Sequence, residues 1–347
     1  MHPALLVRFR PSGPWRIGPA SGAADEVDRV YHSDTLFSAI CAALGRLGLL
    51  EDWLAAAVRN PEGPAVRFSS CCPWMGDLLL VTPPRTLWPP AATPKVRWKS
   101  AQFVPLRLVP ALLADEPLRE ENWWIDPPSR CLLPQRGRQR SGPFRAASRA
   151  HAAVDRLCGS ALPHRSACLE FAPDAGLWTV AVFAGEEARK RWAGPLKSAL
   201  LLLADSGLGG RRSLGWGHSE PPEFIEGSFP EMILPAAEAT VESAPAEPRA
   251  TAWWLLSLFV PAPEDAVDWH KGSYHLLTRG GRIESTARWG EPKKLLRMVA
   301  EGSVLVASQP LRGAAPDVAP DGFPHPVYRA GYAVAAPVPF RPAEVKA

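Results

Sequence analysis

Residues 207–217 contain five glycines, and two arginines follow the third of them. Glycine lets a backbone adopt positive φ angles and approach another backbone closely, while free amides and arginine side chains bind anions. The pattern predicts a phosphate-binding loop. Its candidate contacts are Gly207, Gly209, Gly210, Arg211, Arg212, Ser213, Gly215, Trp216 and Gly217. The alternative is a tight connection that binds nothing, but such a connection does not need paired arginines.

Two familiar phosphate-binding motifs do not fit this loop. A Walker loop ends in Gly-Lys-Ser or Gly-Lys-Thr, which residues 205–218 lack. A dinucleotide fingerprint opens a helix, whereas this loop follows a leucine-rich stretch with the pattern of a helix. The loop is therefore neither of these nucleotide-binding motifs.

Basic stretches with aromatic residues between them are a second indication of an RNA partner. The net charge is only +4, but residues 85–107 hold five basic residues and no acid, and residues 130–165 hold eight arginines and one acid. Such stretches suit a phosphate backbone with stacked bases. We expect RNA contacts from Lys95, Arg97, Trp98, Lys99, Arg136, Arg138 and Arg140. Taken singly, each stretch could instead be a solvated loop.

A third candidate cluster precedes a predicted helix. Apolar residues between 36 and 47 recur at the three-and-four spacing of an amphipathic helix, which predicts a helix over residues 34–46. Arg29, His32 and Ser33 lie at its amino end, where charge, free amides and the helix dipole favour phosphate.

Further elements must position these residues. Alternation and apolar runs predict strands over 4–10 and 177–184, and helical patterns cover 50–58 and 186–204. Residues 61–165 are rich in proline and arginine and are expected to form long excursions or loops. This order fits an elaborated βαββαβ unit. After a Pro-, Ala- and Glu-rich connection, a second domain should begin near residue 250, with a buried strand over 253–260 and further elements within residues 294–306 and 327–338.

Composition limits the number of domains and the class of protein. A chain of 347 residues with 46% hydrophobic residues should form about two domains. It has no apolar run of eighteen residues and no signal-peptide pattern, so we expect a cytoplasmic, soluble protein without a membrane partner. Six cysteines without a CxxC pair suggest mostly buried, reduced thiols. His151, Cys158, His164 and Cys168 cluster, but their spacing matches no common zinc site, and no metal is expected.

Six segments, in order, resemble a known family. They are the string Val27-Asp28-Arg29-Val30-Tyr31-His32-Ser33-Asp34-Thr35-Leu36-Phe37-Ser38-Ala39-Ile40, then residues 67–74, the glycine loop, and residues 272–281, 298–303 and 325–332. Together they are similar to the Csm-type (type III-A) CRISPR subunit that caps the crRNA handle, the fourth Csm subunit of the repeat-associated mysterious protein (RAMP) superfamily. The likeness covers nearly the whole chain. Leu208, Leu214 and Trp216 depart mildly from the usual pattern of the loop.

The resemblance implies an α+β fold of two ferredoxin-like (RRM/RAMP) domains. The first would span residues 1–228, with an insertion at about 61–165 and the glycine loop at 207–217. Residues 229–249 would be a linker, and 250–347 a degenerate second domain. The implied function is to bind the 5′ handle of crRNA and to dock the large signalling, polymerase-like subunit beside a backbone RAMP subunit. Neither catalysis, a cofactor nor a small-molecule substrate is implied.

Two alternatives remain open. A metal-independent endoribonuclease of the same superfamily would use a histidine as general acid or base, for which His32, His151 or His218 are candidates. A scaffold that never touches RNA would leave the glycine loop unexplained.

Reading the handle would also require bases stacked on exposed aromatic rings, for which Trp98, Trp216 and Tyr274 are candidates.

Overall fold

The computed structural model of the chain describes residues 1–19, 21–90, 98–135, 141–235, 251–285, 287–288 and 290–340. Its first half is built on an antiparallel sheet in the order β11-β1-β10-β3-β4-β5, with β2 also paired to β10. The strands are β1 (His2–Phe9), β2 (Val66–Phe68), β3 (Cys72–Met75), β4 (Leu78–Val81), β5 (Val104–Pro105), β10 (Ala175–Phe183) and β11 (Glu223–Phe229). Every residue of β10 is buried, as expected of a central strand.

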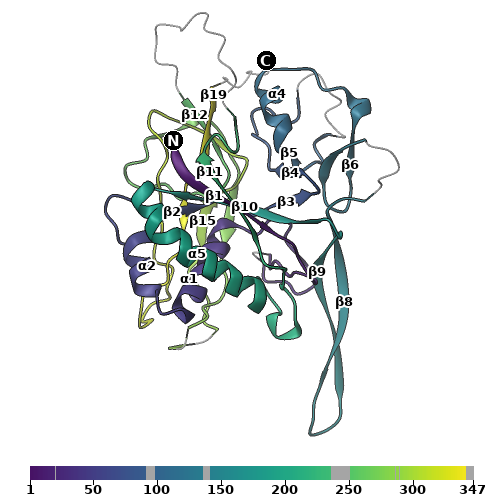
Figure 1. Ribbon diagram of the computed structural model, residues 1–347. Helices are drawn as coiled ribbons and strands as arrows, with labels where there is room; N and C mark the ends of the chain where they lie inside the picture. Colours follow the sequence, from purple (N-terminus) through teal and green to yellow (C-terminus); the bar gives the residue numbers. More distant parts are fainter. Residues whose placement is uncertain are drawn as a thin grey trace, which may run out of the picture.

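Helices cover one face of this sheet (Figure 1). They are α1 (Ser33–Arg46), α2 (Leu50–Ala57) and α5 (Glu186–Ser206). The apolar stripe of α1 faces the core, and Trp53 of α2 meets Trp192 of α5 edge to face, with ring centroids 5.1 Å apart. The short helices α4 (Val109–Leu113), η1 (Leu106–Leu108), η2 (Glu120–Asn122) and η3 (Arg212–Leu214) lie in connections.

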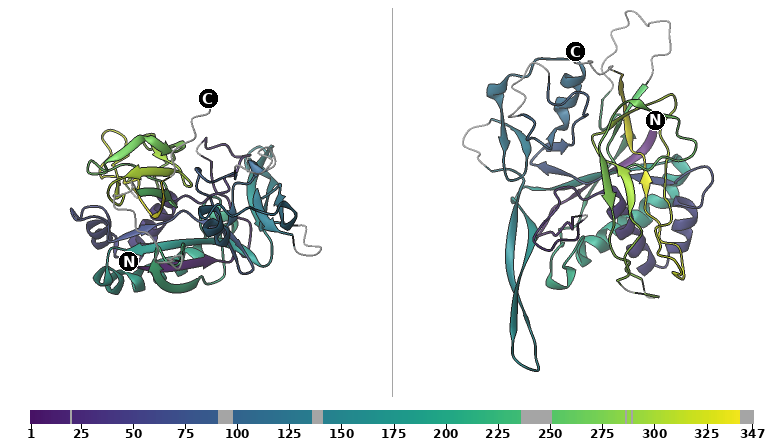
Figure 2. Two further views of the ribbon diagram at one scale, coloured as in Figure 1. Left: turned by 90° about the horizontal axis from the view of Figure 1, so that it is seen from above. Right: turned by 180° about the vertical axis from the view of Figure 1, so that it is seen from behind.

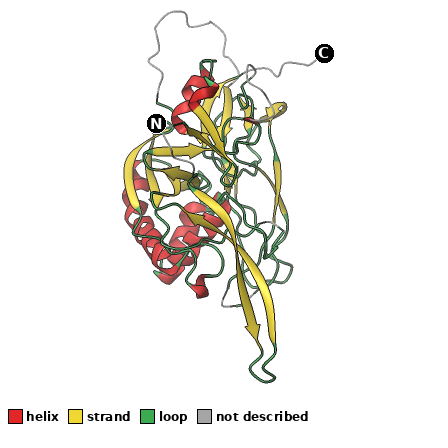
Figure 3. Cartoon of the chain, turned by 90° about the vertical axis from the view of Figure 1, so that its right-hand side faces the viewer, coloured by secondary structure: helices red, strands yellow, loops and turns green. Residues whose placement is uncertain are grey.

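Two hairpins rise from the segment between β5 and β10. One pairs β6 (Trp123–Asp126) with β7 (Cys131–Pro134), and the other pairs β8 (Phe144–Val154) with β9 (Ala161–Phe171). The β8–β9 hairpin projects from the body of the molecule as a long arm (Figure 3). Its turn is exposed, and Leu157 there is 99% accessible. The sequence prediction missed this hairpin because solvent reaches both faces of its outer part, so no apolar alternation marks it.

The second half contains a four-stranded antiparallel sheet in the order β13-β16-β12-β19. Its strands are β12 (Thr251–Leu255), β13 (Val267–Ser273), β16 (Val304–Ala307) and β19 (Ala335–Pro339). Two further pairs are β14 (Leu276–Arg279) with β15 (Leu296–Val299) and β17 (Gly313–Ala314) with β18 (Gly331–Tyr332). The described residues from 251 to 340 contain no helix.

The two halves share one hydrophobic core and lie against each other (Figure 2). Trp254 and Val304 of the second half belong to the same buried cluster as Trp53 and Phe68 of the first. A small separate cluster around Phe259 and Leu305 fills the far side of the second sheet. The chain therefore packs as a continuous body despite its two sheets.

Most predicted elements are confirmed to within a few residues, namely the strands at 4–10 and 177–184 and the helices at 34–46, 50–58 and 186–204. The strand expected over 253–260 ends at Leu255. The chain bends there because the Ser257 hydroxyl donates to the carbonyl of Tyr332 and accepts from the amide of Val334. Among the described helices, none has the length and apolar character needed to cross a membrane.

Candidate nucleic-acid interface

Residues 207–217 follow α5 directly, and four of their glycines have positive φ angles. A Cβ atom on Gly217 would lie 2.1 Å from the carbonyl oxygen of Leu208, and one on Gly209 would lie 2.4 Å from that of Arg16. Both separations are far below van der Waals contact. Glycine is therefore required at these two positions by the close approach of other backbone as well as by φ.

Backbone hydrogen bonds hold the loop against the segment that follows β1. The amide of Gly217 donates to the carbonyl of Pro14 at 2.9 Å, and the amide of Gly210 donates to that of Arg16 at 2.9 Å. The amide of Leu208 closes the loop by donating to the carbonyl of Gly217 at 3.0 Å. The base of the loop is thus fixed, and only its outer part faces solvent.

The outer part of the loop consists of residues 211–215. Arg211 adopts a left-handed conformation, with φ of 63°, and its side chain has no hydrogen bond or ion pair with the residues that the structure describes. Arg211, Ser213, Leu214 and Gly215 are exposed. This surface offers a free guanidinium group and a hydroxyl on a rigid base, which is the chemistry needed to bind a phosphate.

Arg212 differs from Arg211 because it already has an anionic partner. One of its terminal nitrogens, Nη2, lies 2.7 Å and 2.8 Å from the two carboxylate oxygens of Glu284 in the second half. Both side chains remain partly exposed, so the pair is open to exchange with another anion.

Trp98 and Trp216, expected to contact RNA, are buried. Trp98 is 2% exposed and packs edge to face on Trp88, with ring centroids 5.4 Å apart. Trp216 is 5% exposed and lies 5.7 Å from the ring of His151, fixing the loop against the β8–β9 hairpin. Their predicted role as stacking platforms is wrong because neither ring has a free face. Tyr274 is 38% exposed.

His32 and Ser33 are also buried, and the expectation that they face phosphate is wrong. The two ring nitrogens of His32 lie 2.8 Å from Glu301 Oε1 and 3.1 Å from Asp28 Oδ2. The Ser33 hydroxyl accepts from the amide of Leu258 at 3.0 Å. Burial alone would lower the pKa of His32, but the carboxylates of Glu301 and Asp28 raise this pKa to about 10. A histidine that stays charged and fully bonded cannot serve as a base at neutral pH.

Of the remaining predicted RNA contacts outside the glycine loop, the structure describes Arg29 and Lys99 but not the other five. Arg29 is half-buried and donates from Nε to the carbonyl of Pro128 at 3.3 Å, and Lys99 is exposed. Lys95, Arg97, Arg136, Arg138 and Arg140 lie outside the described residues.

Arg16 is a positioning residue that the sequence prediction missed. Its buried guanidinium donates to the carbonyls of Ala23 at 2.6 Å, Ala24 at 2.8 Å and Ala167 at 2.8 Å. Its own carbonyl receives the amide of Gly210. Arg16 thus joins the segment after β1, the base of β9 and the glycine loop. No local pattern distinguishes such a buried arginine from an exposed one.

The histidine and cysteine cluster does not form a compact group. His151 and His164 stack across the β8–β9 hairpin with centroids 5.3 Å apart, whereas Cys158 lies in the exposed turn and Cys168 is buried near the base. No three His, Cys, Asp or Glu side chains in the described ranges are grouped as a metal site would require. The prediction that most cysteines are buried is confirmed, since four of the six are.

Comparison with solved structures defines the class of fold. A chain in the "Csm3-Csm4 subcomplex in the type III-A CRISPR-Cas interference complex" matches with a TM-score of 0.63 and 18% identity, over 97% of this chain and 100% of that one. A chain in the "Csm1-Csm4 cassette in complex with cA4" matches with a TM-score of 0.56 and 19% identity, over 99% of each chain. The protein therefore has the mixed α/β fold, with few helices and antiparallel sheets, found in these type III-A complexes.

A family match narrows this class. Residues 249–338 match the family model of the CRISPR Csm4 C-terminal domain. This match covers only the second half of the chain, whereas the two solved structures match over nearly the whole chain. No curated protein sequence matches the chain.

Proposed function

We propose that the chain is the crRNA-binding, non-catalytic subunit of a type III-A CRISPR effector complex. It would bind the repeat-derived 5′ handle of crRNA and dock the large signalling subunit, Csm1, next to the backbone subunit, Csm3. The main support is the loop at residues 207–217, which presents Arg211, without a partner among the described residues, on a base that only glycine can form. The matched structures combine Csm4 with Csm3 and with Csm1, which supports the proposed partners.

The proposed domain organisation follows the same family. The strand order β11-β1-β10-β3, with α1 between β1 and β2 and α5 between β10 and β11, supports an elaborated ferredoxin-like domain over residues 1–228. The proposed insertion, residues 61–165, carries the β6–β7 hairpin and most of the β8–β9 hairpin. It also includes β2 to β5, which pair in the sheet of this domain, so the loops expected there are wrong for these strands. Residues 229–249 would be a linker, and 250–347 a degenerate second ferredoxin-like domain, consistent with a sheet that has lost its helices within the described residues.

The proposed RNA path runs over the outer face of the glycine loop. Arg211 and Ser213 would contact phosphate, and Arg212 would join them when RNA displaces Glu284. Arg29 and Lys99 would extend the contacts. A ribonuclease function is disfavoured because His32, which lies within residues 27–40 of the resemblance, is bonded at both nitrogens.

The test is binding of handle-bearing RNA and of the same RNA with a scrambled handle to the co-expressed complex across a salt series. Arg211→Ala should weaken binding by about tenfold or more, because a hydrogen bond to a charged group is worth roughly 1.5–3 kcal/mol. The slope of log affinity against log salt should fall by about one for each lost phosphate contact. Arg46→Ala, which removes an exposed arginine at the end of α1, is the matched control.

Three outcomes would count against the proposal. Equal binding of both RNAs would indicate a scaffold without handle recognition. Unchanged binding by Arg211→Ala would exclude the glycine loop as the contact. Metal-independent cleavage of RNA that is lost in His151→Ala or His218→Ala would move the chain to the nuclease class.

A further inference from the structure

The segment 28–35 places an unusual amount of charge between the two halves of the chain. The carboxylate of Asp34 is fully buried at the start of α1 and faces two arginines of the second half. Arg279 approaches it at 3.2 Å through both Nε and Nη2, and Arg329 donates to it through Nη1. The side chains of Arg279 and Arg329 are only 9% and 6% exposed. Buried charges of this kind persist only when they are paired.

A second charged group lies beside the first. Glu301 of the second half accepts hydrogen bonds from Ser70 and His32, and His32 is also bonded to Asp28. Ser33, between His32 and Asp34, bonds to the backbone of Leu258. Three consecutive residues, 32 to 34, are therefore bonded directly to the second half.

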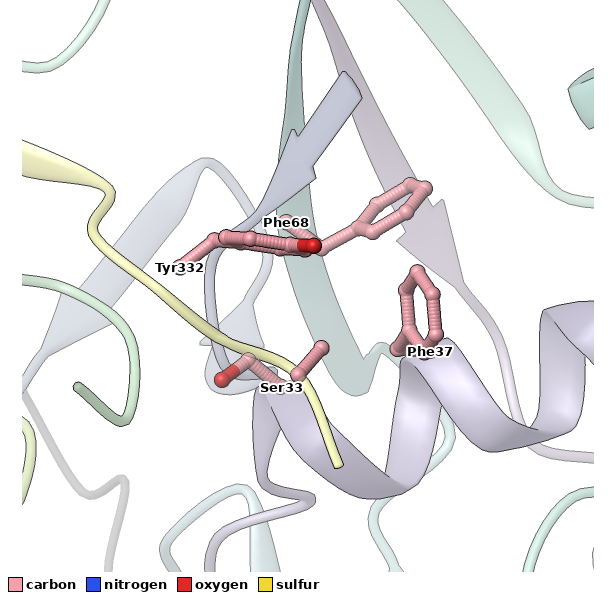
Figure 4. Close-up of a pocket in the computed structure, with 5 residues that line it drawn as sticks. Ser33, Phe37, Phe68 and Tyr332 are labelled. Carbon is pink, nitrogen blue, oxygen red and sulfur yellow. The ribbon is translucent and has the colours of Figure 1, made fainter. Parts of the chain in front are cut away.

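Apolar packing completes this junction. Figure 4 shows the rings of Phe37 from α1, Phe68 from β2 and Tyr332 from the carboxyl-terminal segment close together beside Ser33. Phe37 and Tyr332 meet edge to face with ring centroids 6.4 Å apart. The charged and apolar contacts together leave the amino end of α1 little freedom to move relative to the second half.

The same segment also touches the glycine loop. Tyr31 is 2% exposed, and its hydroxyl lies near the backbone of Gly209. Its ring lies 3.8 Å from the position that a Cβ atom on Gly209 would occupy. Tyr31 is held in turn by the backbone bond from the amide of Cys71 to its carbonyl and by an edge-to-face contact with Trp15.

A second route joins the loop to the second half. Arg329 donates from Nη2 to the carbonyl of Gly280 at 2.5 Å, which fixes the chain just after Arg279. Ile283, three residues further on, is 3% exposed, and the next residue, Glu284, holds Arg212. The loop is therefore supported by Tyr31 at its base and by Glu284 at its outer face.

We propose that residues 31–34 act as a positioning element, in which Tyr31 sets the backbone of the RNA-binding loop and Asp34 fixes this segment to the second half. The inference rests on the proposed function of the loop. It assigns the Tyr-His-Ser-Asp part of the resemblance motif to positioning, in place of direct RNA contact. It also predicts that disturbing the junction between the halves loosens the loop without removing any group that touches RNA.

Tyr31→Phe is the sharpest test because it removes one hydroxyl and leaves the ring. In the co-expressed complex, the amides of residues 207–217 should exchange with solvent several-fold faster than in the wild type. Affinity for handle-bearing RNA should fall by about three- to tenfold, because a loop that is less ordered before binding loses more conformational freedom when it binds. Tyr328→Phe, a partly buried tyrosine elsewhere in the second half, is the matched control and should change neither quantity.

Asp34→Asn tests the other end of the element, with Asp52→Asn on the exposed start of α2 as the control for charge. We expect a lower melting temperature together with faster exchange in the loop, and Asp34→Glu should recover part of both. Loop exchange should be measured at the same interval below the melting temperature of each variant. If the melting temperature fell but loop exchange did not change, Asp34 would have a purely structural role and the proposal would be overturned. If Asp34→Asn does not fold, Tyr31→Phe decides alone.

Amide exchange and RNA binding together distinguish a failure of the proposed function from a failure of the positioning element. If wild-type protein fails to distinguish handle RNA, the proposed function fails, but exchange in Tyr31→Phe still tests the positioning of the loop. If the wild type does distinguish handle RNA, and Tyr31→Phe matches it in affinity and in loop exchange, the positioning element is refuted while the function stands.

Discussion

At the scale of single residues, the buried imidazole of His32 links stability to pH. Its folded pKa of about 10 lies above the ordinary histidine value of 6.5, because the carboxylates of Glu301 and Asp28 outweigh the effect of burial. A raised pKa stabilises the folded state fully below about pH 6.5, and this contribution is lost as pH rises towards 10. Between pH 6.5 and 10, the free energy of unfolding of the wild type should therefore fall by on the order of a few kcal/mol more than that of His32→Gln. Denaturant unfolding at several pH values measures this slope.

Asp34 links stability to pH in the acidic range. Burial would raise its pKa, but Arg279 and Arg329 lower it to about 2. Its contribution to stability is therefore present above about pH 3.8 and is lost as pH falls towards 2.

His275→Gln, at an exposed position of the second half, is the control for the alkaline prediction. If His32→Gln showed the same alkaline slope as the wild type and His275→Gln, His32 would not be the residue responsible.

At the scale of elements, the glycine loop depends on close contacts between backbone segments that leave no room for a side chain. Gly217 has φ of 86°, and a Cβ atom there would meet Leu208. Gly217→Ala should destabilise the chain by roughly 1–3 kcal/mol, the usual cost of a strained backbone position. Gly194→Ala in α5 is the contrasting variant, since a Cβ atom there meets nothing within 4 Å and alanine favours helix. Thermal unfolding should show a loss for the first variant and no loss for the second; equal melting temperatures would show that the loop relaxes freely.

At the scale of the whole molecule, the shared core and the buried charges predict that the two halves unfold together. Trp254 of the second half packs in the same cluster as Trp53 of the first, and Asp34 pairs with arginines of the second half. Calorimetry should therefore show a single transition, even though domains with small interfaces often unfold separately. Asp34→Asn should broaden or split that transition. Two resolved transitions in the wild type would mean that the interface adds little to stability.

Much of the fold could be predicted from the sequence because it depends on neighbouring residues. The spacing of Leu36 and Ile40 determined α1, the apolar run at 177–183 determined β10, and the glycines of 207–217 determined a loop with positive φ angles. Each signal arises within about twenty residues, where periodicity and backbone preference act. The resemblance motifs were also recognised from local strings.

Only the tertiary structure decided which candidate side chains are free. Asp34 meets Arg279 and Arg329 across 245 and 295 residues of sequence, and burial, not residue type, removes His32 and Trp98 from the proposed RNA surface. The sequence could place a histidine before a helix or a tryptophan in a basic stretch. It could not show what covers them, because burial is a property of segments brought together from distant parts of the chain.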